Sequence, residues 1–278
     1  MTATWNFTDL EFVVLWERHT DDALPAPFVY TCRYDRESEY ERAKFETWER
    51  LRIQVGRSFE GVLETVSNPE AVITVCAWCD HEMENPKKRL WVHAVRSGAQ
   101  AYVLTQLPGE TIDHSGGFTV VECAPRDLAE AVVRTLPAAV PAGRQENITI
   151  ITGDMLAGEH HGFRWARVSD DGVESVEARS LRFFRTPATT TGTIRIRQGR
   201  SMFGSRGMDE ELLLWRDVRD DGRYVIPINA NPIAMGVGTE RLSRMVDTAI
   251  ELMLERAEDH WETAQSLSNQ RRHLGAAW

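Results

Sequence analysis

The feature that most constrains the fold of this chain is a predicted β-hairpin over residues 212–228. Two apolar runs rich in β-forming residues flank an Asp-Gly dipeptide at residues 221–222, and this dipeptide is typical of tight hairpin turns. Strand side chains point alternately to opposite faces, so the first run is apolar on both faces. Its side chains are Leu212, Leu213, Leu214 and Trp215. Such a strand is typical of a sheet that is covered on both sides.

A second segment of similar pattern lies earlier in the chain. Leu90-Trp91 matches Leu214-Trp215, and Tyr102 matches Tyr224. The spacing from tryptophan to tyrosine differs by two residues between the copies, which keeps each side chain on its own face. Strand and helix signals around the two hairpins also correspond. We predict an internal duplication of about 80 residues with a pseudo-twofold axis, and chance similarity of two hairpins is the alternative.

The duplication predicts an α+β fold made of two halves, residues 1–143 and 144–278, fused into one compact domain. The junction is expected in the proline-rich stretch 137–143. The local patterns predict strands at residues 9–17, 71–78, 118–122, 148–152 and 193–198. They predict helices at residues 37–52, 58–66, 126–136 and 240–260, a partly helical stretch at 173–185, and loops at 80–88 and 189–192.

Composition excludes several classes of function. The net charge is −10 and the longest run of lysine and arginine has only three residues, Lys87-Lys88-Arg89, which argues against binding to nucleic acid. No apolar run approaches 18 residues, so no membrane span is expected. The first residues lack the basic and apolar regions of a signal peptide, and the 4 cysteines are few for a disulfide framework. We therefore expect a cytoplasmic protein.

No motif predicts catalysis or a metal. Cys76 and Cys79 stand three apart around the end of a predicted strand, where they face opposite sides and cannot grip one ion. The adjacent pair His160-His161 diverges in the same way. The glycine-rich stretch 199–207 lacks the lysine and the following helix of a phosphate loop. Its Met202 and Phe203 suit contact with another protein.

Several segments together resemble the EspG family, the ESX secretion-associated chaperones of type VII secretion. They are Gln198–Gly207, Leu214–Val218, Asp221–Tyr224 and the long terminal helix, and the opening Phe7–Trp16 with Leu24–Pro27 is similar to the opening of that family. The resemblance covers essentially the whole chain. It implies a central, mainly antiparallel sheet flanked by helices.

The resemblance also implies a function. Members bind the exposed apolar tip of a PE–PPE heterodimer, or a related secreted helical client, and keep it soluble in the cytosol until export. They need no cofactor and catalyse nothing. Their contact surface involves the central sheet, the C-terminal helical part, and the loop between the second and third strands, which corresponds by position to residues 80–88. The candidate partner-binding residues are Asp80, His81, Glu82, Met83, Glu84, Asn85, Lys87, Lys88, Met202, Phe203, Arg216 and Asp217.

Two alternatives remain open at this point. A small-molecule-binding protein or enzyme would use a cleft between the two pseudo-repeats and would line it with convergent ionisable groups. A homodimer would pair the exposed sheet face with itself.

Overall fold

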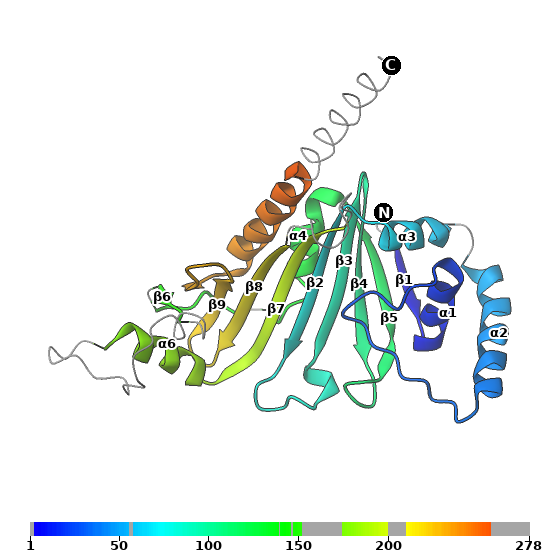
Figure 1. Ribbon diagram of the computed structural model, residues 1–278, viewed down its shortest axis with the longest axis horizontal. Coiled ribbons are helices and arrows are strands. Elements are labelled where there is room, and N and C mark those ends of the chain that lie inside the picture. Colours follow the sequence, from blue (N-terminus) through cyan, green and yellow to red (C-terminus); the bar gives the residue numbers. More distant parts are fainter. Residues whose placement is uncertain are drawn as a thin grey trace, which may run out of the picture.

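The computed structural model describes residues 3–55, 58–138, 140–145, 147–151, 174–199 and 210–256. Its core is a 10-stranded sheet with the strand order β1-β5-β4-β3-β2-β7-β8-β9-β10-β6 (Figure 1). The strands are β1 (Thr4–Phe7), β2 (Ala71–Trp78), β3 (Leu90–Ser97), β4 (Gln100–Pro108), β5 (Ser115–Cys123), β6 (Ile148–Thr149), β7 (Ala188–Gln198), β8 (Glu210–Val218), β9 (Gly222–Pro227) and β10 (Ile233–Gly236). Neighbouring strands pair antiparallel throughout, which confirms the expected fold class.

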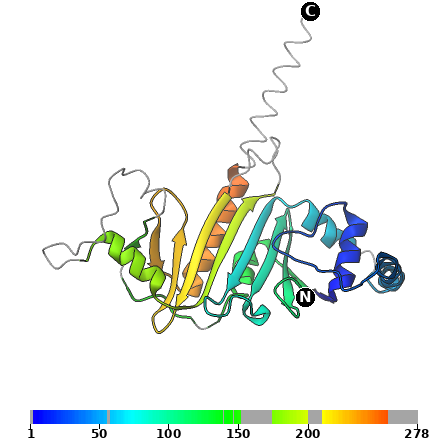
Figure 2. The same ribbon diagram turned by 60° about the horizontal axis from the view of Figure 1, so that its bottom comes forward.

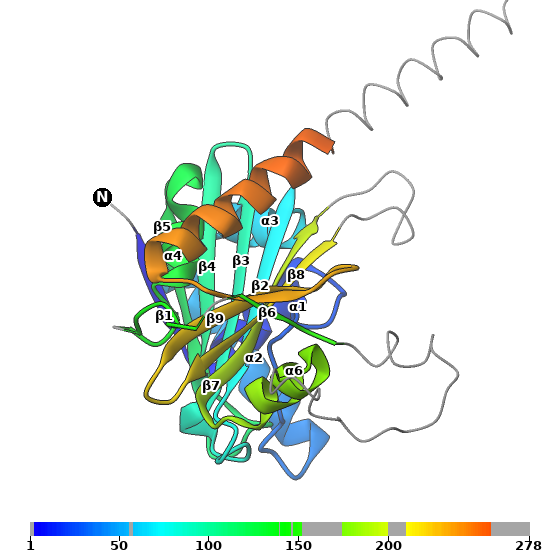
Figure 3. The ribbon, with the colours of Figure 1, turned by 90° about the vertical axis from the view of Figure 1, so that its left-hand side faces the viewer.

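Helices cover parts of both faces of the sheet. They are α1 (Asp9–His19), α2 (Glu37–Gln54), α3 (Ser58–Ser67), α4 (Leu128–Val133), α6 (Val176–Arg185) and a helix over residues 239–256, with short 3-10 turns η1 (Pro86–Lys88) and η2 (Pro125–Asp127). We call the face that carries α1, α2, α3 and α6 the front face, and the face that carries α4 and the 239–256 helix the back face (Figure 3). Among the described helices, none combines the length and the apolar character needed to cross a bilayer.

The back face holds the largest apolar core. The alternation along the central strands sends Ile73, Ile194 and Trp215 to this face, where they pack with Leu128 of α4 and Leu242 of the 239–256 helix. All of these side chains are fully buried. Helices with an apolar stripe cover the sheet here in the way that the i, i+3, i+4 spacing of the 239–256 segment predicts.

The front face holds two separate cores, one at each end of the sheet. Helices α1, α2 and α3 pack on the four adjacent strands β1, β5, β4 and β3, around side chains such as Phe12, Phe59 and Phe118. Helix α6 packs at the other end, where Phe183 contacts Tyr224 with ring centroids 5.3 Å apart. The two helical groups therefore lie at opposite ends of the front face (Figure 2).

The segment 9–17, which we expected to be a strand, is helix α1, so this prediction is wrong. Thr8 and Glu11 form a capping box: the Thr8 hydroxyl accepts from the Glu11 N–H, and the Glu11 carboxylate accepts from the Thr8 N–H. All five residues from Phe12 to Trp16 are buried in the helix. The segment is therefore apolar on every side, and its sequence looks like that of a buried strand.

The loop expected at residues 189–192 is also wrong, because these residues belong to β7. Gly192 is required there by packing. A Cβ at this position would lie 2.5 Å from the ring of Trp215 on the neighbouring strand. The glycine is therefore a space-making residue inside a strand, not a turn signal.

Strand order is the same on both sides of the central β2–β7 pair. It runs β3, β4, β5, β1 on one side and β8, β9, β10, β6 on the other. The match between Trp91 and Trp215 is wrong, however: Trp91 packs in the front core and Trp215 in the back core. The duplication and the two-half organisation stay predictions, which superposition of the halves tests.

Candidate partner-binding surface

The connection between β2 and β3 forms a projecting, internally bonded loop over residues 79–89. The Asn85 side chain accepts from Lys87 N–H at 3.0 Å and donates to the Glu82 carboxylate at 2.7 Å. Arg89 donates from Nε to the carbonyl of Met83 at 2.9 Å. These bonds hold the loop while leaving its other side chains outward, and Met83 is 49% exposed. Residues 80–88 are thus confirmed as a loop, between the second and third strands of the sheet.

The individual candidates in this loop differ in exposure. Most are exposed, namely His81, Glu82, Met83, Glu84, Lys87 and Lys88. Asp80 and Asn85 are half-buried, because Asn85 bonds within the loop and Asp80 pairs with Arg216 on β8.

Arg216 connects this loop to α6 from inside the molecule. Its guanidinium donates to the Asp80 carboxylate at 3.1 Å, to the carbonyl of Phe183 at 2.6 Å and to the carbonyl of Thr186 at 3.1 Å. It also lies over the rings of Phe183 and Phe184, at 5.4 and 5.5 Å from the centroids. The α6 carbonyls need such a donor because the last carbonyls of a helix lack partners within it.

Asp217 is the counter-ion of Arg223 on the next strand. The two side chains form a bidentate pair at 2.6 and 2.9 Å, and each is only 1% exposed. Arg223 also donates to the carbonyl of Pro137 at 3.0 Å.

The burial of Arg216 and Asp217 corrects our expectation that they contact a partner. Arg216 is 4% exposed and the charges of both side chains are occupied inside the chain. Polar side chains in a strand can face either solvent or an internal counter-ion, and the local sequence does not distinguish the two cases. Arg216 and Asp217 therefore position the loop and the hairpin.

Between the two helical groups, a strip of the front face carries no described helix (Figure 1). It consists of eight front-facing side chains of three adjacent central strands, β2, β7 and β8, and we call it the open strip. Every one of these side chains is half-buried or exposed. They are Thr74, Cys76, Trp78, Thr193, Arg195, Arg197, Leu212 and Leu214. Other front-facing side chains of these strands, such as Val72, Thr191 and Arg216, are buried and do not belong to it.

The open strip corrects one further expectation. Leu212 and Leu214 were expected under a second covering layer, but both are only half-buried, whereas Leu213 and Trp215 on the back face are fully buried. Helices cover the back face of β8, and the front face of β8 forms part of the open strip.

The two cysteines of the Cys-x-x-Cys segment are free thiols. Cys76 lies in the open strip, where burial raises the pKa of its thiol and the positive charges of Arg195 and Arg89 partly oppose that rise. Within the described part of the chain, no three His, Cys, Asp or Glu side chains gather in a way that could hold a metal ion.

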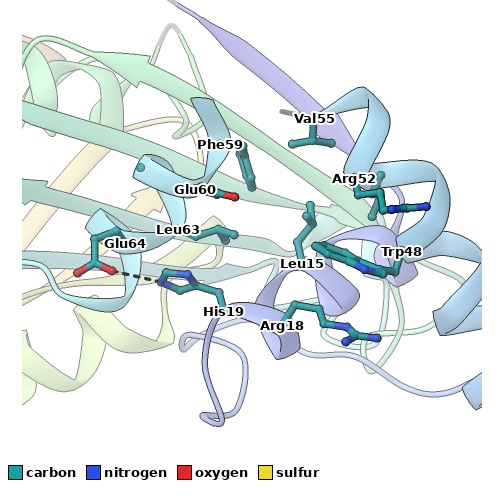
Figure 4. A pocket seen from close by; sticks show the side chains of 12 residues that line it. Leu15, Arg18, His19, Trp48, Arg52, Val55, Phe59, Glu60, Leu63 and Glu64 are labelled. Carbon is teal, nitrogen blue, oxygen red and sulfur yellow. Dashed lines mark ion pairs between the residues drawn. The ribbon is translucent and has the colours of Figure 1, made fainter. Parts of the chain in front are cut away.

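A groove of about 750 Å³ lies between α1, α2 and α3 (Figure 4). Trp48, Leu51 and Leu63 form part of its apolar lining, and the His19–Glu64 ion pair at 3.7 Å closes one end. The small-molecule alternative required a cleft between the two halves. This groove lies within the N-terminal half, away from the β2–β7 junction.

Four of the residues singled out in the sequence lie outside the described residues. They are His160, His161, Met202 and Phe203. The contribution of Met202 and Phe203 to partner binding stays a prediction.

The comparisons with known proteins identify the family. The sequence model of the EspG family matches residues 8–233. The chain belongs to the EspG family. No curated protein sequence matches it.

A solved structure similar to this EspG-family chain is the type VII secretion system chaperone EspG5 of Mycobacterium tuberculosis, determined in complex with the PE25–PPE41 dimer. The TM-score is 0.57 and the sequence identity 12%, and the match covers 90% of this chain and 96% of that one. At this identity the likeness shows a common fold.

The residues of the open strip were not among the candidates named from the sequence, although the family resemblance implied that the central sheet takes part in contact. A usable signal was present in Thr193-Ile-Arg-Ile-Arg197, whose strict polar and apolar alternation is typical of a strand with one solvated face. The alternation could have placed both arginines on that face. It could not have shown that β2 and β8 flank them, because those pairings join residues far apart in the chain.

Proposed function

We propose that this chain is a cytoplasmic chaperone of type VII secretion that binds the apolar tip of a PE–PPE-like client and keeps it soluble for export. Membership of the EspG family supports a binding role of this kind rather than catalysis. The fold shared with EspG5, which was solved with a PE25–PPE41 dimer, supports the class of client.

The single observation that carries the location of the site is the open strip. Most apolar side chains of the central strands pack under helices, yet Leu212, Leu214 and Trp78 are left only half-buried in the middle of the front face. A chaperone that covers an apolar client tip needs such a surface of mixed polarity, because it must also release the client. The β2–β3 loop borders the strip through the Asp80–Arg216 contact and forms its rim.

Co-expression with each PE–PPE pair encoded near this gene, followed by gel filtration and light scattering, tests the proposal. We expect a complex with one copy of each of the three chains. The isolated chain, run at increasing concentration, shows whether the open strip also supports a weak homodimer. Failure of every encoded pair to form a complex would overturn the proposal.

A matched pair of variants locates the contact. Leu212→Lys places a charge in the open strip, and Ile53→Lys makes the same change on α2, where Ile53 is 79% exposed. We expect the first variant to lose the client and the second to keep it, with both chains folded. Equal retention of the client by both variants would place the contact outside the strip.

Cell fractionation tests the location. A chaperone that acts before export should be recovered with the cytoplasmic fraction in the presence and in the absence of its client. Recovery with secreted proteins would contradict this part of the proposal.

A further inference from the structure

The open strip is positively charged, although the chain as a whole carries a net charge of −10. Arg195 and Arg197 stand two residues apart on β7, so both side chains point to the front face. The guanidinium of Arg89 adds to this charge, since it acts with Arg195 on the thiol of Cys76. Three cations of this acidic protein are thus gathered on one surface that no described helix covers.

The carboxylate of Glu210, at the edge of the open strip, does not balance these cations. Glu210 on β8 pairs with Arg195 at 3.2 Å, and both side chains remain largely solvated, at 40% and 49% exposure. Glu210 also lies opposite Arg197 in the strand register, but Arg197 makes no ion pair within 4.0 Å with a residue of the described ranges. Burial, and to a smaller extent the positive charge of Arg197, lowers the pKa of the nearby His93. His93 therefore supplies no charge that could balance Arg197. An excess of positive charge is therefore available to a partner.

Apolar side chains stand beside the arginines in a fixed register. Arg195 pairs across with Leu212 of β8 and with Thr74 of β2. Leu214 and Trp78 continue the apolar part of the strip toward α6 and the β2–β3 loop. A partner that covers this surface must place carboxylates over β7 and apolar groups over β8 and the end of β2.

The dimensions of the strip fit one helix. Three adjacent strands span about 10 Å, and a helix with its side chains is about 10–12 Å across. Residues two apart on β7 are separated by about 6.6 Å, and residues four apart on a helix rise about 6 Å. Carboxylates one turn apart on a helix running along β7 therefore match the spacing of Arg195 and Arg197.

We propose that the open strip binds an acidic amphipathic helix of the client, in which two carboxylates one turn apart pair with Arg195 and Arg197 while apolar side chains cover Leu212, Leu214 and Trp78. This inference rests on the proposed chaperone function and adds the chemistry of the segment that is recognised. Guanidinium groups suit this task because their planar donors pair with carboxylates in bidentate geometry.

Charge reversal tests the inference. Arg197→Glu is compared with Arg126→Glu, which changes the net charge equally at a side chain of η2 that is 88% exposed and remote from the strip. The affinity for the client pair is measured by calorimetry at low and high salt, and the fold is checked by circular dichroism and thermal unfolding. We expect Arg197→Glu to weaken binding at least tenfold and to reduce its salt dependence, and Arg126→Glu to change neither.

A neutral variant and a reciprocal change complete the test. Arg197→Gln should weaken binding less than Arg197→Glu, and a carboxylate-to-lysine change in the client helix should restore binding to Arg197→Glu. Equal affinities for Arg197→Glu and Arg126→Glu would overturn the acidic-helix inference while leaving the chaperone function in place. Absence of binding by the unaltered chain to every client pair would overturn both.

Discussion

The buried pair Asp217–Arg223 gives the sharpest test of the interior of this molecule. The pair joins β8 to β9 directly across the strand register, at 2.6 and 2.9 Å, and both side chains are 1% exposed. Through Pro137 it also fixes the end of the first half to the second hairpin. Asp217→Leu removes one charge and leaves Arg223 without its counter-ion, with only the Pro137 carbonyl as a partner.

The magnitude follows from what remains buried after the change. An uncompensated guanidinium in this position should cost about 3–5 kcal/mol of the free energy of unfolding. Arg223→Met should cost a similar amount, because it leaves the buried carboxylate of Asp217 without a counter-ion and the Pro137 carbonyl without its hydrogen bond. The double variant buries no charge, so its cost should reduce to about 1–3 kcal/mol for the lost carbonyl bond. The two changes are therefore strongly non-additive.

Urea unfolding followed by circular dichroism measures all three variants. Glu46→Leu is the control, since Glu46 makes an ion pair with Arg42 at 2.8 Å on the surface of α2, where both side chains are more than half exposed. This control should change stability far less. Additive costs, or a cost below about 1 kcal/mol for Asp217→Leu, would refute the assignment of Asp217 to an internal role.

Three further predictions concern separate parts of the chain. Burial lowers the pKa of His93 from 6.5 to about 4, so between these pH values the unfolded chain binds a proton that the native chain does not. The free energy of unfolding should therefore fall by up to about 3 kcal/mol as the pH drops from 6.5 to 4. In urea titrations, His93→Gln should make the free energy of unfolding less dependent on pH over this range. Replacing residues 81–88 by a Gly/Ser linker, with Asp80 retained for its contact with β8, should weaken client binding and leave the melting temperature nearly unchanged; a large drop in melting temperature would make the loop structural. Gly192→Ala should destabilise the chain by about 1–3 kcal/mol in urea unfolding, because the new methyl group would overlap the Trp215 ring, and an unchanged midpoint would contradict this packing.

The fold was predictable where local signals were strong. The hairpin of β8 and β9 and the helix over residues 37–52 are both confirmed because their patterns need no distant partner. The turn itself lies at residues 219–221, one residue earlier than expected, and Gly222 begins β9. Helix α1 was missed although its capping box was readable at Thr8 and Glu11. The buried apolar run that follows these residues fits a strand equally well when periodicity alone is considered.

The candidate site was predictable only in part. The β2–β3 loop followed from its position, whereas the open strip depends on the neighbours of β7, which come from residues far away in the chain. Arg216 was misplaced for the same reason. Its partners Asp80 and Phe183 belong to segments whose proximity the sequence does not reveal.

The seam between β2 and β7 has a consequence for any attempt to divide the molecule. The two strands pair over eight consecutive positions, from Ala71 with Gln198 to Trp78 with Thr191. Each half produced alone would present this long ladder of N–H and C=O groups to solvent, beside apolar side chains, and would invite aggregation. The same pairing of β2 with β7 would let the two fragments associate when they are produced together. The protein could therefore be divided into a split reporter whose signal depends on this reassembly.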